Sequence, residues 1–343
     1  MVIVLKILTK GGVTMRTKFL AGFLFAALIL TALANVGYGA DPQYPTRQMQ
    51  LVVAGGAGGG TDVVARLLAQ FVTKKLGQQI LVVNKPGGGT VVGTHFGLKE
   101  AKPDGYSFHT DTHACSSMMI AGMLKPPATL EDRVFISRVI EDSMVYAVKA
   151  DAPWKTFREL TEWVKAHVKE LTYGAGGPAG TSAFGVNDWL SNAGLNPLDA
   201  RLVTTDSGMD ALIKVAGGHT TLACNTVAEA YTLAQAGKIR VLAVASEKRS
   251  PFMPDVPTVA ENGLPPVLVS WWAGVSAPAG TPQYAVDKWA KALEEVSKDP
   301  AFLQQVQNLH YTVSYLGPAA FKEFVNKETE HYTRIATKVG VRK

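Results

Sequence analysis

The hydrophobic pattern of this chain opens with two short apolar runs, residues 51–54 and 80–83, that have no polar alternation. Such runs are typical of strands buried on both faces of a parallel sheet. A turn signal at residues 102–106 leads into a third strand candidate at residues 107–110. We expect the carboxyl ends of these strands to lie along one sheet edge, where open α/β sheets bind their ligands.

A glycine-rich turn joins the first run to a predicted helix. Five of the six residues 55–60 are glycine, and the apolar positions that follow predict a helix over residues 61–76. Thr61 is the predicted N-cap, Asp62 suits the positive end of the helix dipole, and Gly77 is the predicted stop. Because no side chain shields the backbone N–H groups of such a turn, it is a candidate anion site.

The spacing of these glycines excludes two common phosphate-binding motifs. A G-x-G-x-x-G motif would need a third glycine where Thr61 or Val63 stands, and a P-loop would need a lysine that this loop lacks. A tight, closely packed turn is the structural alternative, although a turn needs only one or two glycines. A second glycine stretch, residues 87–89, follows the second apolar run and weakens that alternative.

The second half of the chain repeats the alternation of strand and helix. Residues 134–136 and 144–148 are strand candidates that cross towards this half, and residues 154–171 have helical spacing. A third glycine-rich loop, residues 173–182, enters another helix. Further strands are predicted at residues 202–204, 222–224 and 241–244, with helices at 211–216 and 228–236. This alternation predicts a second parallel α/β sheet.

The first 39 residues are predicted to be a secretory signal peptide rather than part of the fold. A basic segment from Met15, which is an alternative start, precedes the apolar residues 19–34, and cleavage is predicted near Gly39. A retained membrane anchor is the alternative, although the apolar run is short for a spanning helix. The leader carries four basic residues and no acid, so its removal lowers the net charge from +6 to about +2. The basic composition is therefore no evidence for nucleic-acid binding.

The sequence contains no recognisable catalytic or metal-binding motif. Its seven histidines form no H-E-x-x-H motif or Cys/His cluster with metal-ligand spacing, and no serine lies in G-x-S-x-G. Cys115 and Cys224 would be able to pair in an oxidising compartment, but we favour two free, buried thiols. The sequence therefore favours a binding protein over an enzyme and predicts no metal and no cofactor.

The motifs, taken in order, resemble those of one known family. Strand-G-G-G-T-D-helix is followed by N-K-P-G-G-G at residues 84–89, P-D-G-Y at 103–106 and T-H-A at 112–114. The runs at residues 173–177, 236–244, 250–258 and 277–282 complete the set. In this order and spacing they resemble the solute-binding proteins of tripartite tricarboxylate transporters, the Bug family, over nearly all of the chain after residue 44.

This resemblance implies an α/β fold of the two-domain periplasmic binding protein class, a type II Venus flytrap with a ligand cleft between its domains. Domain 1 would comprise residues 40–146 and 267–343, and domain 2 residues 147–266. The chain would recross near residues 267–275, and tail helices at 284–297 and 320–338 would finish domain 1. The two cysteines would then lie in different domains.

The function implied by the resemblance is that of a periplasmic, monomeric receptor. It would capture a small organic carboxylate for membrane transporter subunits and would bind no nucleic acid. Two alternatives stay open on the sequence alone. One is a sensory receptor that reports to a membrane kinase, and the other is a secreted α/β hydrolase, for which no activated nucleophile is recognisable.

The ligand would lie between glycine-rich loops of the two domains. The candidate ligand-binding residues are Gly58, Gly59, Gly60, Thr61, Asp62, Gly88, Gly89, Thr90, Thr112, His113, Gly177, Thr181, Ser182, Asp206 and Asn225. His113 would either donate a hydrogen bond to the ligand or bond to local backbone at a helix N-terminus. Asp62 would either organise water on the ligand or cap its own helix.

Two departures from the family pattern bear on the ligand. Many members have a proline and an aromatic residue directly after the first strand, where this chain has Ala54 and Gly55. A lysine or arginine position in the second domain is Asp206 here. If Asp206 faces the cleft, it disfavours a polyanion and suits a hydroxyl or amine group, whereas a solvent-facing loop aspartate is the alternative. Tricarboxylate binding therefore does not follow from the fold.

Overall fold

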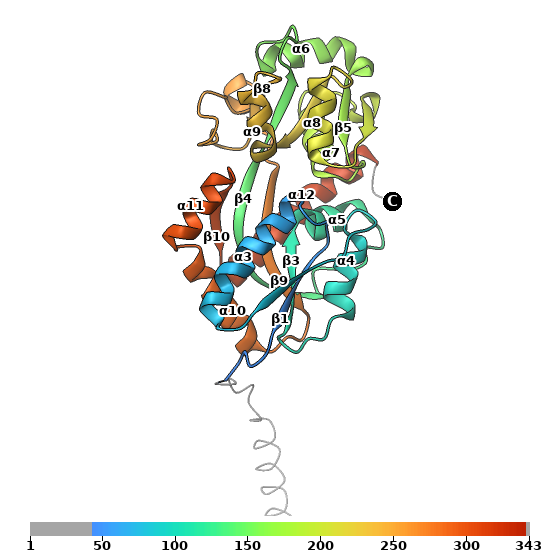
Figure 1. Cartoon of the computed structure of the whole chain (residues 1–343). Coiled ribbons are helices and arrows are strands. Elements are labelled where there is room, and N and C mark those ends of the chain that lie inside the picture. The colour runs from blue at the N-terminus through green and yellow to red at the C-terminus, as the bar shows by residue number, and fades with distance from the viewer. Residues whose placement is uncertain (1–42, 341–343) are drawn as a thin grey trace, which may run out of the picture. The chain divides into compact units, whose positions relative to one another are not determined.

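The computed structural model describes residues 43–340 of the chain. The predicted signal peptide of residues 1–39, its cleavage site and the alternative start at Met15 lie outside these residues. The residues from Tyr44 onward form one unit, in which two lobes share a continuous mixed sheet (Figure 1). The strand order through this sheet is β2-β1-β3-β9-β4-β7-β5-β6, and β8 and β10 each pair with β4.

Three parallel strands form the base of the first lobe. β1 (Met49–Val53) lies between β2 (Ile80–Asn84) and β3 (Ser107–Thr112), parallel to both. Their carboxyl ends therefore meet at one sheet edge, which confirms the arrangement that the apolar runs predict. The helices of this lobe are α3 (Gly60–Leu76), α4 (Val91–His95), the π-helix η1 (Phe96–Glu100), η2 (His113–Cys115), α5 (Ser117–Gly122), α10 (Gln283–Val296), α11 (Pro300–Asn308) and α12 (Pro318–Val339).

Helix α3 confirms one sequence prediction at its end and corrects another at its start. Gly77 ends the helix in the left-handed conformation, with φ 72°, as the predicted stop requires. The prediction that Thr61 caps the helix is wrong, because the helix begins at Gly60 and the extended Gly59 takes the N-cap position. Thr61 is therefore the second helical residue, and its side chain is free for another role.

One long strand runs from the first lobe into the second. The sequence predicts two strands, residues 134–136 and 144–148, but the structure has the single strand β4 (Arg133–Lys149). The more polar residues between the two apolar runs stay extended because they pair with β9 (Ser270–Pro278). At Ser143 the strand still pairs with β9, and from Met144 onward it pairs with β7 and β8 of the second lobe.

The second lobe contains the predicted second parallel sheet. β5 (Thr172–Ala175) is parallel to β6 (Arg201–Thr204) and to β7 (Leu222–Thr226). β8 (Ile239–Ala245) departs from the prediction, because it pairs antiparallel with β4. The helices of this lobe are α6 (Phe157–His167), η3 (Val168–Glu170), α7 (Thr181–Asn192), η4 (Pro197–Asp199), α8 (Gly208–Ala216), α9 (Val227–Gln235) and η5 (Ala260–Asn262).

Each lobe has its own aromatic-rich core. In the first lobe Phe108 stacks on Trp289, with ring centroids 4.0 Å apart, and in the second Tyr146 stacks on Phe157, with centroids 4.5 Å apart. Such pairs add about 0.5–1.5 kcal/mol to the stabilisation from burying their apolar area. β4 and β9 run between the lobes (Figure 1), and Met118 and Ala121 of α5 join the core of the second lobe.

The C-terminal helix α12 packs on both lobes. Phe321 lies edge-on to Phe135 of the first lobe, whereas Tyr332 lies in the core of the second lobe against Phe184. The family resemblance implies that this helix belongs to domain 1 alone. The predicted domain boundaries at residues 146 and 267 stay a prediction, since strand pairing and core packing divide the chain at different places.

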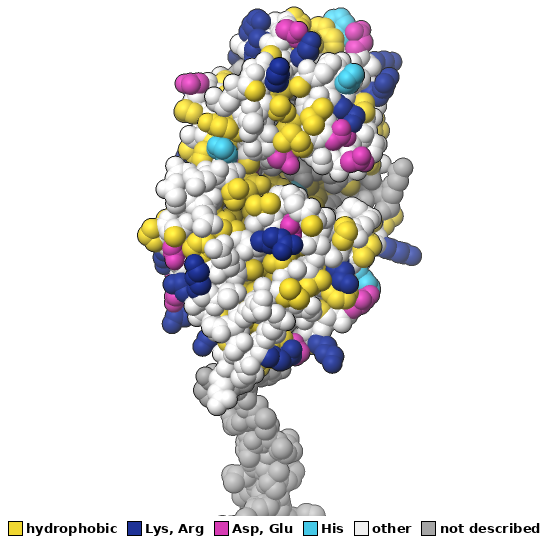
Figure 2. Space-filling view, viewed as in Figure 1, with side chains coloured by type: hydrophobic (Ala, Val, Ile, Leu, Met, Phe, Trp, Pro, Cys, Tyr) yellow, Lys and Arg dark blue, Asp and Glu magenta, His cyan; other side chains and the backbone are white. Residues whose placement is uncertain are grey.

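The described surface has two features that bear on partners. On the face shown in Figure 2, basic and acidic side chains are spread over both lobes, and this face has no single basic patch of the kind that binds nucleic-acid backbones. Within residues 43–340, no helix is both long enough and apolar enough to cross a membrane.

Candidate functional site

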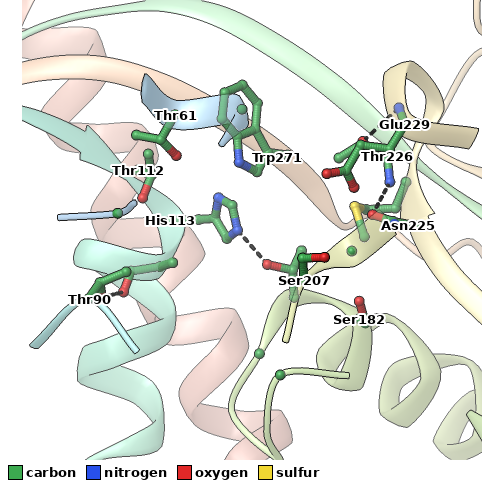
Figure 3. A pocket seen from close by; sticks show the side chains of 18 of the residues that line it. Thr61, Thr90, Thr112, His113, Ser182, Ser207, Asn225, Thr226, Glu229 and Trp271 are labelled. Carbon is green, nitrogen blue, oxygen red and sulfur yellow. Dashed lines mark hydrogen bonds between the residues drawn. The ribbon is translucent and has the colours of Figure 1, made fainter. Parts of the chain in front are cut away.

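A cavity of about 410 Å³ lies between the two lobes. Its walls come from the carboxyl ends of strands in both lobes and from the first residues of α3, α7, α8 and α9 (Figure 3). The first N–H groups of a helix have no partner within the helix, and the helix dipole makes that end positive. Such an end suits an anionic group where no acidic side chain of the chain competes for it, as at α7, whose first turn contains no acid.

Nine of the predicted ligand-binding residues line this cavity. They are Gly60, Thr61, Thr90, Thr112, His113, Thr181, Ser182, Asp206 and Asn225. The first five belong to the first lobe and the last four to the second, so the structure brings together segments more than a hundred residues apart in the sequence. Their role in binding stays a prediction.

The other six predicted residues do not line the cavity: Gly58, Gly59, Asp62, Gly88, Gly89 and Gly177. Asp62 is only 2% exposed, and its carboxylate accepts hydrogen bonds from the Gly58 N–H (2.8 Å), Arg66 Nε (3.0 Å) and Asn84 Nδ2 (2.9 Å). The Arg66 hydrogen bond, with those from Gly58 and Asn84, lowers the pKa of this carboxyl although its burial opposes that shift. Asp62 therefore holds the turn together.

The remaining glycines outside the lining serve turn geometry. Gly88 and Gly89 have φ of 58° and 61°, and Gly177 has φ of 151°, all in conformations that L side chains rarely adopt. The Gly177 carbonyl also accepts the N–H of Gly180 (3.1 Å). In the second glycine stretch it is Thr90 that reaches the cavity, and its hydroxyl donates to the Ala114 carbonyl (2.8 Å).

His113 spans the cavity between the lobes (Figure 3). Its Nε2 is hydrogen-bonded to the hydroxyl of Thr181 at the start of α7. Burial lowers the pKa of His113 to about 3, so the ring is neutral at physiological pH. A neutral ring offers one donor and one acceptor, which lets it link the lobes and still position a hydrogen bond.

A buried ion pair holds the turn that carries His113. Arg133 Nη1 contacts both carboxylate oxygens of Asp111, at 2.8 and 3.0 Å, and both side chains are fully buried. Arg133 Nη2 also donates to the Cys115 carbonyl (3.0 Å). Because an unpaired buried charge is costly, these contacts fix the backbone directly after β3.

Several side chains that line the cavity are not among the residues predicted from the sequence. The main ones are Ser207, Thr226, Glu229, Trp271 and Tyr311. Thr226 and Glu229 stand three residues apart at the start of α9, and the Thr226 hydroxyl accepts the N–H of Glu229 (3.3 Å). This is the T-x-x-E capping pattern, which the sequence does contain and which marks a helix start after a strand.

Two aromatic residues close one wall of the cavity. Trp271 and Tyr311 stack with ring centroids 5.3 Å apart, and the Tyr311 hydroxyl lies close to Gly60, 3.0 Å from where a Cβ there would sit. Trp271 lies in β9 and Tyr311 directly precedes β10, so no local pattern links them to the glycine loops. Together they supply an aromatic surface, whereas Ala54 and Gly55 supply none at the end of β1.

Among residues 43–340, those that line the cavity include two acids, Asp206 and Glu229, and neither a lysine nor an arginine. Asp206 borders the cavity and is exposed to solvent, so the cleft-facing and the solvent-facing alternatives for this residue both stay open. Burial raises the pKa of the Glu229 carboxyl, against the effect of the nearby Asn225 and Thr226 side chains.

Both cysteines are free and buried, as the sequence analysis favours. Cys115 borders the cavity, and burial raises the pKa of its thiol, which makes it a poor nucleophile. Within residues 43–340, no group of three or more His, Cys, Asp or Glu side chains is placed to hold a metal ion.

The architecture and the sequence both match known proteins. Residues 64–341 match the model of the tripartite tricarboxylate transporter family receptor. A UPF0065 protein from the ttuE-ttuC' intergenic region of Agrobacterium vitis is 30% identical over 334 residues, which cover 95% of this chain and 92% of that protein.

Solved structures show the same fold. The periplasmic binding protein BugD has a TM-score of 0.75 and 29% identity, over 88% of this chain and 100% of its own. MatC from Rhodopseudomonas palustris, solved with bound malate, has a TM-score of 0.74 and 24% identity, over 85% of this chain and 99% of its own. These findings confirm the two-domain Venus-flytrap fold of a solute-binding protein, and this chain belongs to the tripartite tricarboxylate transporter receptor family.

Proposed function

We propose that this protein is a periplasmic receptor that captures a small organic carboxylate between its lobes. It would present the closed complex to the membrane subunits of a tripartite tricarboxylate-type transporter. The observation that carries this proposal is the convergence of the N-termini of α3 and α7, one from each lobe, on one cavity.

The first residues of α3 and α7 are the best candidates for holding the carboxylate. Gly60 and Thr61 start α3, Thr181 and Ser182 start α7, and all four line the cavity. Their backbone N–H groups and hydroxyls would donate to the carboxylate oxygens, directly or through ordered water. Such hydrogen bonds to a charged acceptor are about twice as strong as those between neutral groups.

The size and charge of the cavity limit the ligand further. A cavity of about 410 Å³ falls within the usual range for small-molecule sites, about 300–1,000 Å³. Two acids and no lysine or arginine in the described lining would repel a tricarboxylate. MatC, which shares the fold, was solved with malate, so the fold accommodates a small organic acid.

Closure of the lobes would couple binding to transport. β4 and β9 connect the lobes, and His113 contacts Thr181 across the cavity, so a ligand held by both sides would favour the closed form. We infer that the receptor acts as a monomer in the periplasm after removal of residues 1–39. The family and BugD support the periplasmic location.

A thermal-shift screen of the protein without residues 1–39 would test the proposal. The set would include aliphatic di- and tricarboxylates, aromatic carboxylates, hydroxy acids and amino acids, with neutral sugars and polyamines as controls. A ligand at about a hundred times its Kd adds roughly 2.7 kcal/mol of stability, which raises the melting temperature by several degrees. Shifts with sugars or polyamines and with no acid would contradict carboxylate binding.

A further inference from the structure

The polar groups of the cavity divide into a side that suits anions and a side that suits cations. Helices α3 and α7 present their N-termini, and the first turn of α7 contains no acid. The start of α9 instead carries the acid Glu229, beside the amide of Asn225 at the end of β7. Figure 3 shows Glu229 and Asn225 on this second side, facing Trp271, Thr61 and His113 across the cavity.

The N-terminus of α9 is already occupied by a carboxylate of the chain itself. The N–H of Ala228, in its first turn, donates to Asp142 Oδ2 (3.0 Å), and Asp142 is only 4% exposed. A ligand anion at this helix would therefore find the Ala228 N–H already bonded to Asp142 and would meet the acidic side chain of Glu229, which lines the cavity. This end of the cavity suits an anion less well than the starts of α3 and α7, although a helix begins there.

Glu229 and Asn225 lie next to each other because residue 208 is glycine. A Cβ on Gly208 would sit 2.3 Å from Glu229 Oε2 and 2.7 Å from Asn225 Nδ2. The missing side chain leaves space in which the carboxylate and the amide come together beside the first residue of α8. Any larger residue at position 208 would push them apart.

Asn225 leaves a hydrogen-bond donor unused in this space. Its Oδ1 accepts the Thr226 N–H (2.8 Å), which fixes the orientation of the amide. Its Nδ2 is buried beside the Glu229 carboxyl and has no hydrogen bond of good geometry among the described residues, and the side chain as a whole is only 4% exposed. Such a donor is available to an oxygen of a ligand or of a water molecule. The site thus offers a donor, Asn225, directly beside an acceptor, Glu229.

We propose that Glu229 and Asn225 form a subsite for an amino acid ligand, with Glu229 holding its ammonium group and Asn225 an oxygen of its neighbouring carboxylate. This inference rests on the proposed carboxylate receptor and narrows its ligand class to amino carboxylates. The remainder of the carboxylate would face the N-termini of α7 and α3. Asp206, at the rim, adds a second negative charge that favours a ligand with a positive one.

Two series of three ligands each test this assignment. Within a series, only the substituent on the carbon next to the carboxylate changes, from amino to hydroxyl to hydrogen. Aspartate, malate and succinate form one series, and phenylalanine, phenyllactate and phenylpropionate another, each measured by titration calorimetry. In the series that fits the cavity, the amino acid should bind at least tenfold more tightly than the hydroxy acid and the unsubstituted acid. Equal or tighter binding of the hydroxy or unsubstituted acid would overturn the ammonium subsite and leave the carboxylate receptor intact.

The wider acid screen separates failure of the subsite from failure of the function. If no carboxylate of any kind binds, the proposed function fails, and the subsite fails with it. If hydroxy acids or plain dicarboxylates bind and amino acids do not, only the subsite is wrong.

Two substitutions and one control test whether the preference for an amino acid comes from this subsite. Glu229→Gln keeps the size of the side chain and should weaken amino acid binding at least tenfold, while the unsubstituted acid binds as well as before or better. Gly208→Ala should weaken the amino acid similarly, because its Cβ would displace both subsite side chains. Glu247→Gln removes an equal charge at an exposed position outside the cavity and should change neither affinity. Equal weakening of all three ligands of a series by Glu229→Gln would show a general loss of the site and contradict the subsite.

Discussion

Two glycine-rich turns lead into helices that face the cavity, and they differ in what occupies them. In the turn before α3, the Gly58 N–H donates to Asp62, which is buried and also contacts Arg66 and Asn84. In the turn before α7, the first helical turn contains no acid, and Thr181 faces His113 and the cavity.

This difference shows that a glycine-rich turn is not by itself an anion site. At α3 the chain supplies its own carboxylate to the turn, so the turn mainly stabilises the fold, and only Gly60 and Thr61 remain available to a ligand. At α7 no carboxylate of the first turn competes with a ligand. We therefore expect substitutions at the first turn to change stability and those at the second to change binding.

The largest expected effect is on stability. Asp62→Ala leaves the Gly58 N–H and Asn84 Nδ2 without their acceptor and removes the partner of Arg66, which should lower the free energy of unfolding by about 2–4 kcal/mol. Chemical denaturation measures this, and carboxylate affinity of the folded protein should change little. Asp287→Ala, at an exposed position on α10, is the control. If the Asp62→Ala protein were as stable as the wild type but no longer bound ligand, the turn before α3 would serve binding rather than stability, which contradicts the comparison.

The second effect is a pH dependence of stability that comes from His113, the first-lobe residue hydrogen-bonded to Thr181 of α7. The folded protein keeps His113 neutral down to a pKa of about 3, whereas the unfolded chain takes up a proton below about pH 6.5. The free energy of unfolding therefore falls as the pH drops from 6.5 towards 3, by about 2 kcal/mol between pH 7 and pH 5 from this residue alone. Between pH 7 and pH 5, the free energy of unfolding of His113→Asn should therefore fall by about 2 kcal/mol less than that of the wild type.

Denaturation curves at pH 7, 6 and 5 would measure this difference. His219→Asn, at an exposed position, is the control and should follow the wild type. The stabilisation from Asp62 changes at lower pH. Its pKa lies below the usual value, so its contribution to stability is lost only as the pH falls through that lowered pKa. Parallel curves for the wild type and His113→Asn would contradict a neutral, buried His113.

A carboxylate placed at the α7 turn should convert it into a turn like that of α3. Ser182→Asp puts an acid in the first turn of α7, which suits the helix dipole but competes with a ligand carboxylate. We expect at least a tenfold loss of carboxylate affinity in calorimetry, with an unchanged or raised melting temperature. Ser182→Asn is the uncharged control and should bind more tightly than Ser182→Asp.

The smallest expected effect concerns the hydroxyl that links the lobes. Thr181→Val keeps the shape of the side chain but removes the hydroxyl bonded to His113, so carboxylate affinity should fall by about three- to tenfold, the usual range for one hydrogen bond. The melting temperature should change by only a few degrees. Thr181→Ser retains the hydroxyl and should keep most of the affinity. Equal losses in both variants would mean that packing, not the hydrogen bond, matters here.

Local patterns in the sequence predicted much of the fold and part of the cavity. Unbroken apolar runs marked β1 and β2, and Gly77 marked the end of α3, because burial and left-handed backbone leave a direct signature in residue type. The same patterns could not show that residues 134–136 and 144–148 belong to one strand, since β9, which pairs with the residues between them, lies far along the chain. They also gave no sign that α12 packs on both lobes.

The sequence by itself determined which segments form glycine-rich turns at helix starts, since these are a local property of the backbone. Only the tertiary structure decided which of them reach the ligand. Asp62 turned out to be bonded within its own turn and to Asn84, whereas Glu229, Trp271 and Tyr311 came into the cavity from other elements. The physical reason is that a side chain's partners are set by the packing of distant segments, which residue spacing along the chain does not record.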